Sequence, residues 1–214
     1  MAGKKAPLRF FASDLDGTLL GKLDATQSFR DTWIRLPSKQ RPLLCYNTGR
    51  LLDDTLSLIK ERILPPPDYL ICGVGTLIYD FKAKKPIKSF QTILEEGWDK
   101  KLVEQVLREK VPGATLQPSH FQTDYKSSWY ANDLTGDALG ELDEALEKAG
   151  LEINLVYSSN RDLDILPKFA NKGNALSWLL KHLHVPRTQC AVAGDTGNDS
   201  AMILKRGVRG IVVG

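Results

Sequence analysis

Asp14 and Asp16, two residues apart, are the first residues along this chain whose types and spacing suggest a chemical role. They follow an apolar run at 8–12 that has the length of a buried strand, and Gly17 turns the chain after them. In an extended segment, residues two apart point to the same side, so both carboxylates can approach one point in space. A bound Mg²⁺ would relieve their repulsion, because this ion prefers carboxylate, water and phosphate oxygens. The alternative is an Asp-Gly loop with two solvated acids.

Three further polar clusters end or follow apolar elements. One is a Thr-Gly-Arg turn, one is a lysine at a helix start, and one is a Gly-Asp-Thr-Gly-Asn-Asp turn. Taken singly, each is equally well explained as a plain turn, a solvated lysine or a flexible acidic loop. Their joint occurrence, in this order and each at a strand end or helix start, favours a single site. The residues concerned are Thr48, Gly49 and Arg50, then Lys172, and finally Asp195, Asn198 and Asp199.

Most of the chain alternates buried strands with amphipathic helices. This alternation predicts an α/β fold, a doubly wound parallel sheet (Rossmann-like) with helices on its faces. Ligands of such sheets bind beyond the carboxyl ends of the strands, where the four clusters fall. The predicted strands are 8–12, 42–46, 69–72, 190–193 and 210–213, and the predicted helices are 26–36, 51–63 and 171–182.

The middle of the chain has a different pattern, which predicts an inserted α+β unit. Two strand-like pieces are joined through a lysine-rich turn, and later strands pair as hairpins beside two amphipathic helices. The boundaries predicted from this change are 1–80 with 168–214 for the sheet domain and 81–167 for the insert. The predicted pieces are strands at 77–80, 87–93, 126–132, 151–157 and 163–166, and helices at 95–110 and 137–148.

The composition is that of an ordinary globular protein. A formal net charge of +3 over 214 residues gives no argument for nucleic-acid binding. No signal peptide and no stretch of membrane-spanning length is evident, so a cytoplasmic protein without membrane contact is expected. Cys45, Cys72 and Cys190 fall in apolar runs without metal-type spacing and are expected to be buried thiols.

The four clusters together resemble the motifs of the haloacid dehalogenase superfamily of phosphatases. Asp14-Leu15-Asp16-Gly17-Thr18 matches its first motif, Thr48 its second, Lys172 its third and the turn at 194–199 its fourth. The insert lies where the superfamily carries C2 caps, and its pattern is similar to the C2B type. The resemblance implies an α/β core domain with an inserted α+β cap domain.

Within the superfamily, several stretches resemble the sucrose-6-phosphate phosphatases and their bacterial relative, mannosylfructose-phosphate phosphatase. They are 50–54, 126–129, 157–167 and 171–175, and the similarity covers almost the whole chain. Those relatives continue with an Asn-Ala stretch and a further helix, whereas this chain ends at the strand that closes with Gly214. A truncated or naturally shortened form is the corresponding expectation.

The resemblance implies phosphate monoester hydrolysis through an aspartyl-phosphate. Asp14 would be the nucleophile, and Asp16 would protonate the leaving sugar oxygen and later activate water. Asp14 and Asp195 would ligate Mg²⁺ with the backbone carbonyl of Asp16, and Asp199 would support the site with Asn198. Thr48, with its turn at Gly49 and Arg50, would bind phosphate, and Lys172 would offset charge on phosphate and nucleophile.

The resemblance also implies that the cap chooses the sugar. Lys126, Asn160, Asp162 and Asp164 are the expected sugar contacts, and Trp129 is a candidate for stacking on a sugar ring, although core packing is the commoner role of such a residue. The expected substrate is sucrose-6-phosphate or mannosylfructose-phosphate. The alternatives are a phosphatase for other sugar phosphates and a non-catalytic sugar-phosphate-binding partner of a sugar-phosphate synthase. A monomer is expected.

Overall fold

β1, over Phe10–Ser13, is an inner strand of the larger sheet and ends directly before Asp14. The computed structural model describes residues 7–195 and 199–213. It divides into two units, residues 1–87 with 171–214 and residues 88–170. The two aspartates at 14 and 16 therefore belong to the first unit, together with the lysine at 172 and the last acidic turn.

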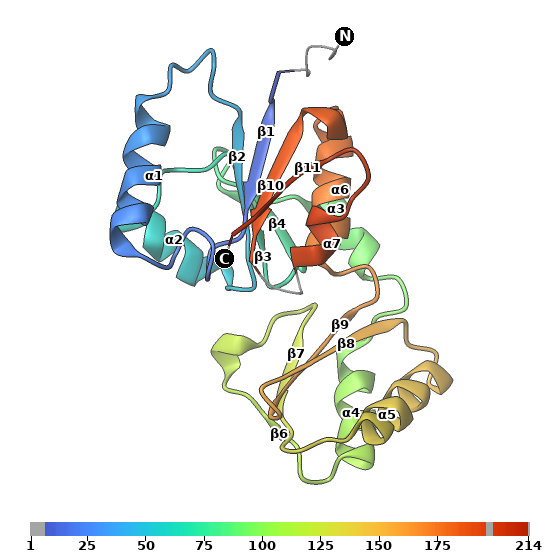
Figure 1. Ribbon diagram of the computed structural model, residues 1–214. Helices are drawn as coiled ribbons and strands as arrows, with labels where there is room; N and C mark the ends of the chain where they lie inside the picture. The colour runs from blue at the N-terminus through green and yellow to red at the C-terminus, as the bar shows by residue number, and fades with distance from the viewer. Residues whose placement is uncertain (1–6, 196–198, 214) are drawn as a thin grey trace. The chain divides into compact units, whose positions relative to one another are not determined.

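The first unit is built on a seven-stranded sheet in the order β11-β10-β1-β2-β3-β4-β5 (Figure 1). The strands from β11 to β3 are parallel, and β4 and β5 continue the sheet as antiparallel strands. A parallel sheet whose order runs outward in both directions from β1 is doubly wound, which confirms the predicted fold class. The other strands are β2 (Leu43–Asn47), β3 (Tyr69–Cys72), β4 (Leu77–Asp80), β5 (Lys85–Pro86), β10 (Cys190–Gly194) and β11 (Arg209–Val212).

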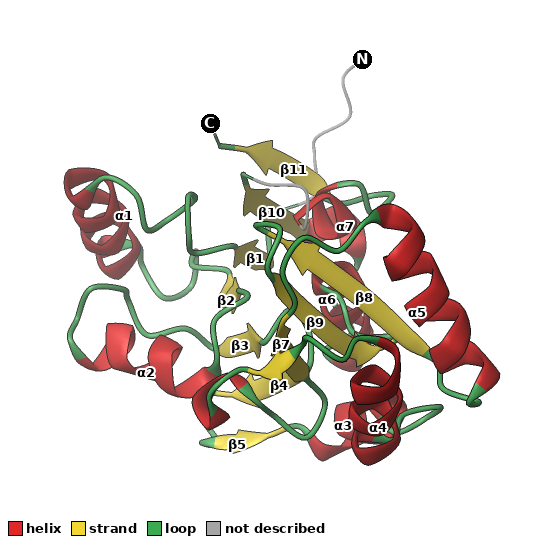
Figure 2. Ribbon diagram, turned by 90° about the horizontal axis from the view of Figure 1, so that it is seen from below, coloured by secondary structure: helices red, strands yellow, loops and turns green. Residues whose placement is uncertain are grey.

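Helices cover both faces of this sheet (Figures 1 and 2). On one face α1 (Leu23–Arg35) and α2 (Leu52–Lys60) bury Trp33 and Ile59 in a cluster with Leu44 and Tyr46 of β2. On the other face lie α6 (Lys172–His182) and α7 (Ser200–Ile203), and a short 3-10 turn, η2 (Arg187–Gln189), leads into β10. Burial on both faces explains why the central strands read as continuous apolar runs.

The three cysteines lie in this sheet and are free, buried thiols, as predicted. Burial raises the pKa of Cys72 and of Cys190 to about 12 and raises that of Cys45 as well. Thiols that stay protonated are poor nucleophiles, so these cysteines have a packing role in the structure.

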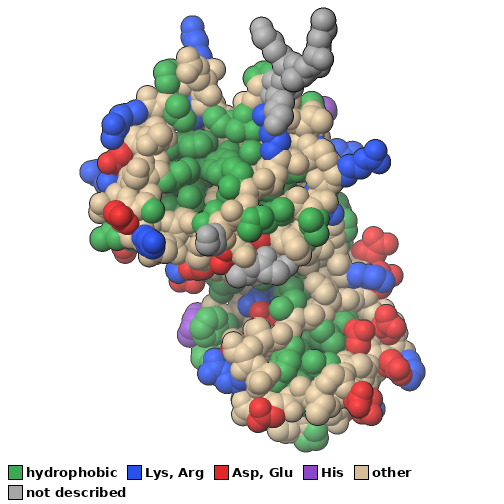
Figure 3. All heavy atoms as spheres, in the orientation of Figure 1, with side chains coloured by type: hydrophobic (Ala, Val, Ile, Leu, Met, Phe, Trp, Pro, Cys, Tyr) green, Lys and Arg blue, Asp and Glu red, His purple; other side chains and the backbone are tan. Residues whose placement is uncertain are grey.

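The second unit is an antiparallel four-stranded sheet in the order β6-β7-β9-β8, with α4 and α5 packed on one face. Trp129, Leu163 and Leu146 are buried between sheet and helices. Figure 3 shows acidic side chains gathered over the outer side of α5. The elements are α4 (Lys100–Lys110), β6 (Thr115–Leu116), η1 (Ser119–Phe121), β7 (Ser127–Tyr130), α5 (Gly136–Lys148), β8 (Ile153–Ser158) and β9 (Asp162–Pro167).

The strand predicted at 87–93 is wrong, because the segment forms the helix α3 (Lys88–Leu94). Phe90 and Leu94 are fully buried four residues apart, which is helical rather than strand spacing. The helix predicted from 95 begins only at α4. Gly97, with φ of +66°, interrupts the segment, and Asp99 caps α4 by accepting hydrogen bonds from the amides of Lys101 and Leu102.

The units meet at 87/88 and 170/171, against predicted boundaries at 80/81 and 167/168. β5 accounts for the first difference, because it pairs with β4 and extends the larger sheet past the lysine-rich turn. Within the described ranges, no helix has both the length and the apolarity needed to cross a membrane.

Candidate active site

The carboxyl ends of β1, β2 and β10 bring together segments that are far apart in the sequence. The strands are in parallel register, with Ser13 opposite Tyr46 on one side and Ala193 on the other. The amide of Asp14 then donates to the carbonyl oxygen of Ala193 at 2.9 Å. This bond fixes the first aspartate beside the chain that continues to Asp195.

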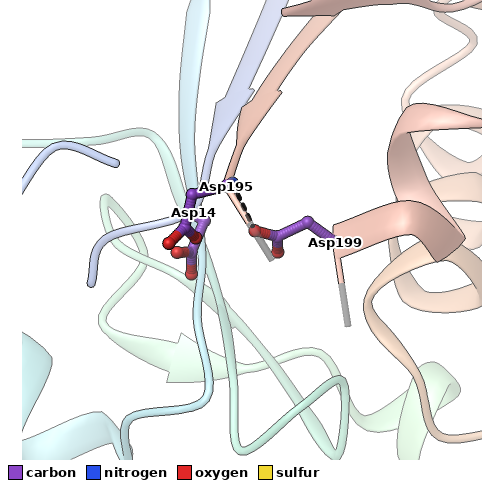
Figure 4. A group of neighbouring side chains, drawn as sticks. All are labelled: Asp14, Asp195 and Asp199. Carbon is purple, nitrogen blue, oxygen red and sulfur yellow. Dashed lines mark hydrogen bonds between the residues drawn. The ribbon is translucent and has the colours of Figure 1, made fainter. Parts of the chain in front are cut away.

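Three carboxylates gather at this edge (Figure 4). Asp14, Asp195 and Asp199 each offer an oxygen, and these oxygens lie within 4.8 Å of one another. Asp199 Oδ2 accepts a hydrogen bond from the backbone amide of Asp195 at 3.0 Å, drawn as the dashed line in Figure 4. The all-oxygen donor set is the kind that Mg²⁺ prefers.

Lys172 is the cation of the cluster. Its Nζ lies 2.6 Å from Asp14 Oδ1 and 2.7 Å from Asp199 Oδ1, and its side chain is buried. Burial raises the pKa of the Asp14 carboxyl above its usual value, and the hydrogen bond from Lys172 offsets part of that rise. The lysine lies at the first residue of α6, where Asn171 caps the helix through the amide of Asn174.

Asp16 lies outside the carboxylate group found among the described residues and pairs with Arg50 instead. The guanidinium donates twice, from Nη2 to Oδ1 at 2.6 Å and from Nε to Oδ2 at 2.8 Å. The hydrogen bond to Asp16 raises the pKa of Arg50 further above its usual value. Arg50 was predicted to contact phosphate, and in this structure it holds the second aspartate of the first motif.

Thr48 is buried at the end of β2. Its amide donates to the carbonyl of Ile71 at 2.9 Å, and its Oγ1 accepts from the amide of Arg50 at 3.1 Å. Because the oxygen of a hydroxyl can accept while its hydrogen donates, the Thr48 hydroxyl still has a proton for an anionic ligand. Because the amide of Thr48 is already bonded, its predicted contact with phosphate would be made by the side-chain hydroxyl.

Two glycines let the acidic segments approach one another, and sequence reasoning did not assign them this role. Gly17 has φ of +80°, and a Cβ there would collide with the carboxylate of Asp195. A Cβ on Gly194 would lie 2.5 Å from Asp199 Oδ2. The signal was available in the sequence, because each glycine lies beside a candidate aspartate at the end of a buried strand.

Polar side chains also gather in the second unit, on the sheet face opposite α4 and α5. Lys126 Nζ lies 3.0 Å from Asp164 Oδ2, and Ser128 Oγ donates to Asp164 Oδ1 at 2.6 Å. Asp162 accepts from Gln117 Nε2 at 3.1 Å and also pairs with its neighbour Arg161. Strand alternation explains the face, because Ser128 lies directly opposite Asp164 in the β7–β9 ladder.

The remaining predicted residues differ in outcome. Asn160, with φ of +50°, lies in the exposed turn between β8 and β9. Trp129 is buried in the core of the second unit, where its Nε1 donates to Ser127 Oγ at 2.8 Å, so the idea that it stacks on a sugar is wrong. Asn198 lies outside the described residues.

Comparison with known proteins agrees with the geometry. Residues 7–214 match the family model described as sucrose-6F-phosphate phosphohydrolase. The chain is 45% identical over 208 residues to a mannosylfructose-phosphate phosphatase of Agrobacterium fabrum, covering 97% of this chain and 84% of that protein. It is 35% identical over 210 residues to sucrose-phosphatase 1 of Nicotiana tabacum, covering 94% of this chain and about half of that protein (49%).

Among solved structures, the sucrose-phosphatase of Synechocystis sp. PCC6803, in complex with sucrose and phosphate, superimposes with a TM-score of 0.83. It is 27% identical, and the match covers 97% of this chain and 83% of that one. A haloacid dehalogenase-like hydrolase of Bacillus subtilis, 17% identical with a TM-score of 0.67 over 95% of this chain and 81% of that one, shares the fold. The chain belongs to the sucrose-6F-phosphate phosphohydrolase family, and it is a phosphoric monoester hydrolase.

Proposed function

We propose that this chain hydrolyses a disaccharide phosphate in a Mg²⁺-dependent reaction, through an aspartyl-phosphate on Asp14. The observation that carries the proposal is the buried cluster of Asp14, Lys172 and Asp199 beside Asp195, in a member of this phosphatase family. Of the two expected substrates, mannosylfructose-phosphate is favoured over sucrose-6-phosphate, because the relative named for it has the higher identity and coverage.

Asp14 is the proposed nucleophile. Its carboxylate oxygen attacks phosphorus, the bond from phosphorus to the sugar oxygen breaks, and water later attacks the same phosphorus to free inorganic phosphate and the carboxylate. Burial removes water from the attacking oxygen, and Lys172 orients it through the 2.6 Å contact. A fixed ammonium also offsets charge that the phosphoryl oxygens bring into the site.

Asp16 is the proposed acid and base. Its carboxyl gives a proton to the departing sugar oxygen and takes one from the water that attacks the intermediate. In the structure both carboxylate oxygens accept hydrogen bonds from Arg50, so one of these bonds must open before Asp16 transfers a proton. Thr48, whose hydroxyl proton remains available, is proposed to bind a phosphate oxygen with the turn at Gly49.

Asp14 and Asp195 are the proposed Mg²⁺ ligands, with the backbone carbonyl of Asp16. Both carboxylate oxygens of Asp199 already accept hydrogen bonds, one from Lys172 and one from the amide of Asp195, so Asp199 is proposed to orient the other groups. When bound, Mg²⁺ supplies a Lewis acid that neutralises charge on the phosphoryl oxygens.

The polar face of the second unit is proposed to bind the sugar through Lys126, Asn160, Asp162 and Asp164. Hydroxyl-rich ligands need convergent polar groups, and the Lys126–Asp164–Ser128 network is preformed for them. The remaining expectations, a monomer in the cytoplasm with a sugar-phosphate synthase as possible partner, stay predictions.

Lys126→Met tests this assignment. The variant keeps the buried stem and removes the charged donor, so KM for the disaccharide phosphate should rise about tenfold while kcat changes little. Steady-state kinetics on one substrate measures both constants. Lys148→Met is the matched control, because Lys148 forms an exposed i,i+4 pair with Glu144 and should leave KM unchanged. Equal KM values for the two variants would contradict the proposed sugar contact.

The proposed substrate is tested by comparing phosphate release from mannosylfructose-phosphate, sucrose-6-phosphate and a set of monosaccharide phosphates with one preparation. We expect kcat/KM to be highest for mannosylfructose-phosphate. Equal or faster turnover of the monosaccharide esters would instead assign a broader sugar-phosphate phosphatase. Tight binding of a disaccharide phosphate without any phosphate release would support the regulatory, non-catalytic alternative.

A further inference from the structure

Asn47, the last residue of β2, is fully buried next to the proposed catalytic cluster, although it belongs to none of the motifs. Its Nδ2 donates to the backbone carbonyl of Lys172 at 3.0 Å and also contacts Met202 Sδ at 3.4 Å. The amide therefore joins the end of a central strand to the first residue of α6 and to α7.

Burial of the Asn47 side chain lowers the stability of the fold. Within residues 7–195 and 199–213, its Oδ1 has no hydrogen-bond partner. A buried polar atom without a partner destabilises a fold, and an apolar side chain of similar size avoids that cost. A residue that stabilised only the core would be replaceable here without loss.

The Lys172 backbone is held from several sides. Lys172 carries the ammonium that contacts both Asp14 and Asp199, while its carbonyl accepts from Asn47. A Cβ on Gly75 would lie 2.5 Å from the carbonyl oxygen of Asn171, and a Cβ on Gly173 would collide with the backbone carbonyl of Ala201. The first turn of α6 is thus packed backbone to backbone on two sides, and Asn47 supplies a directional polar contact from the sheet.

We propose that Asn47 is a positioning residue, which fixes the position of the Lys172 ammonium relative to Asp14 and Asp199. The inference rests on the proposed role of this cluster in phosphoryl transfer. Hydrogen bonds have a narrow range of distance and angle, whereas apolar packing allows small shifts, so the amide fixes the start of α6 more sharply than a hydrophobic residue would. Displacement of a charge-stabilising group lowers kcat even when the fold is intact.

Asn47→Val and Asn47→Ala test the inference, since both remove Nδ2. The Lys172 carbonyl remains in the hydrogen-bond ladder of α6, so neither variant leaves it unpaired. We expect kcat to fall about tenfold in both variants, the change that corresponds to the loss of about one hydrogen bond. The melting temperature of Asn47→Val should stay near that of the wild type or rise, and the cavity in Asn47→Ala should lower it.

Cys45→Ala is the matched control, because Cys45 is equally buried, lies two residues earlier on the same side of β2, and its Sγ donates to the backbone carbonyl of its neighbour Tyr46. A cavity there should lower the melting temperature with kcat nearly unchanged. If kcat instead follows melting temperature across the three variants, Asn47 has only a structural role and the inference is overturned.

A crystal structure of Asn47→Val separates this inference from the proposed function. We expect the Lys172 ammonium to be displaced from Asp14 or Asp199. An ammonium that keeps both contacts overturns the positioning role whatever the turnover. Wild-type protein that releases no phosphate contradicts the proposed function alone.

Discussion

Asp14→Asn should abolish phosphate release, by about a thousandfold or more, while the protein stays folded. An amide is a far weaker nucleophile than a carboxylate, and without the aspartyl-phosphate the reaction loses its two-step route. The fold should persist because the amide of Asp14 keeps its bond to Ala193 and Lys172 keeps Asp199 at 2.7 Å. Release of inorganic phosphate and a thermal melt together check both parts of the prediction.

Asp24→Asn is the control for that experiment. Asp24 is an exposed aspartate in the first turn of α1, where its carboxylate accepts from the amide of Ala25, so the same change should leave turnover unaltered. Wild-type turnover by Asp14→Asn would refute the nucleophile assignment. Loss of the folded state in that variant would show that the carboxylate is needed for the cluster itself.

Removal of Mg²⁺ by a chelator should lower turnover by at least about a hundredfold and should also lower the melting temperature. Three carboxylate oxygens lie within 4.8 Å of one another, and Lys172 is the cation that pairs with two of these residues. A divalent ion that binds only the folded state stabilises it by mass action, so stability should rise with the Mg²⁺ concentration. Added Mg²⁺ should restore both turnover and melting temperature.

Asp195→Asn shows whether the effect arises at this cluster. The variant removes one charged ligand but keeps its size, so the rise in melting temperature with Mg²⁺ should become much smaller than in the wild type. An unchanged Mg²⁺ response in Asp195→Asn would locate the ion elsewhere. Turnover that survives exhaustive chelation would contradict the metal dependence.

The strands of the core could be predicted from the sequence because each is a short apolar run between strong turn signals. The strands at 69–72 and 77–80 have the predicted bounds, since Pro65-Pro66-Pro67 precedes the first and Gly73-Val74-Gly75-Thr76 separates the two. The prediction of a strand at 87–93 was wrong because the apolar residues in so short a window fit the spacing of a helix as well as that of a strand. Phe90 and Leu94 are both fully buried, and their spacing of four residues is that of one helix face.

The candidate site could be predicted as a set of residues but not as a set of contacts. The order of the motifs identified Asp14, Thr48, Lys172 and Asp195, and the predicted family and its phosphatase activity are confirmed by the comparisons. Pairings across distant loops, such as Arg50 with Asp16, depend on tertiary geometry that no local pattern contains. Asn47 was missed for the same reason, because its partner is a backbone atom 125 residues away.

The glycines around the cluster restrict how this protein can be engineered. Replacing glycine by alanine inside a helix is usually a mild route to thermal stability, yet Gly173 of α6 faces the carbonyl of Ala201 with no space for a methyl group. Gly17, Gly75 and Gly194 have the same restriction. Libraries for heat tolerance or altered substrate range should keep these four positions constant and vary residues 88–170, where glycines such as Gly113 and Gly140 have open space around them.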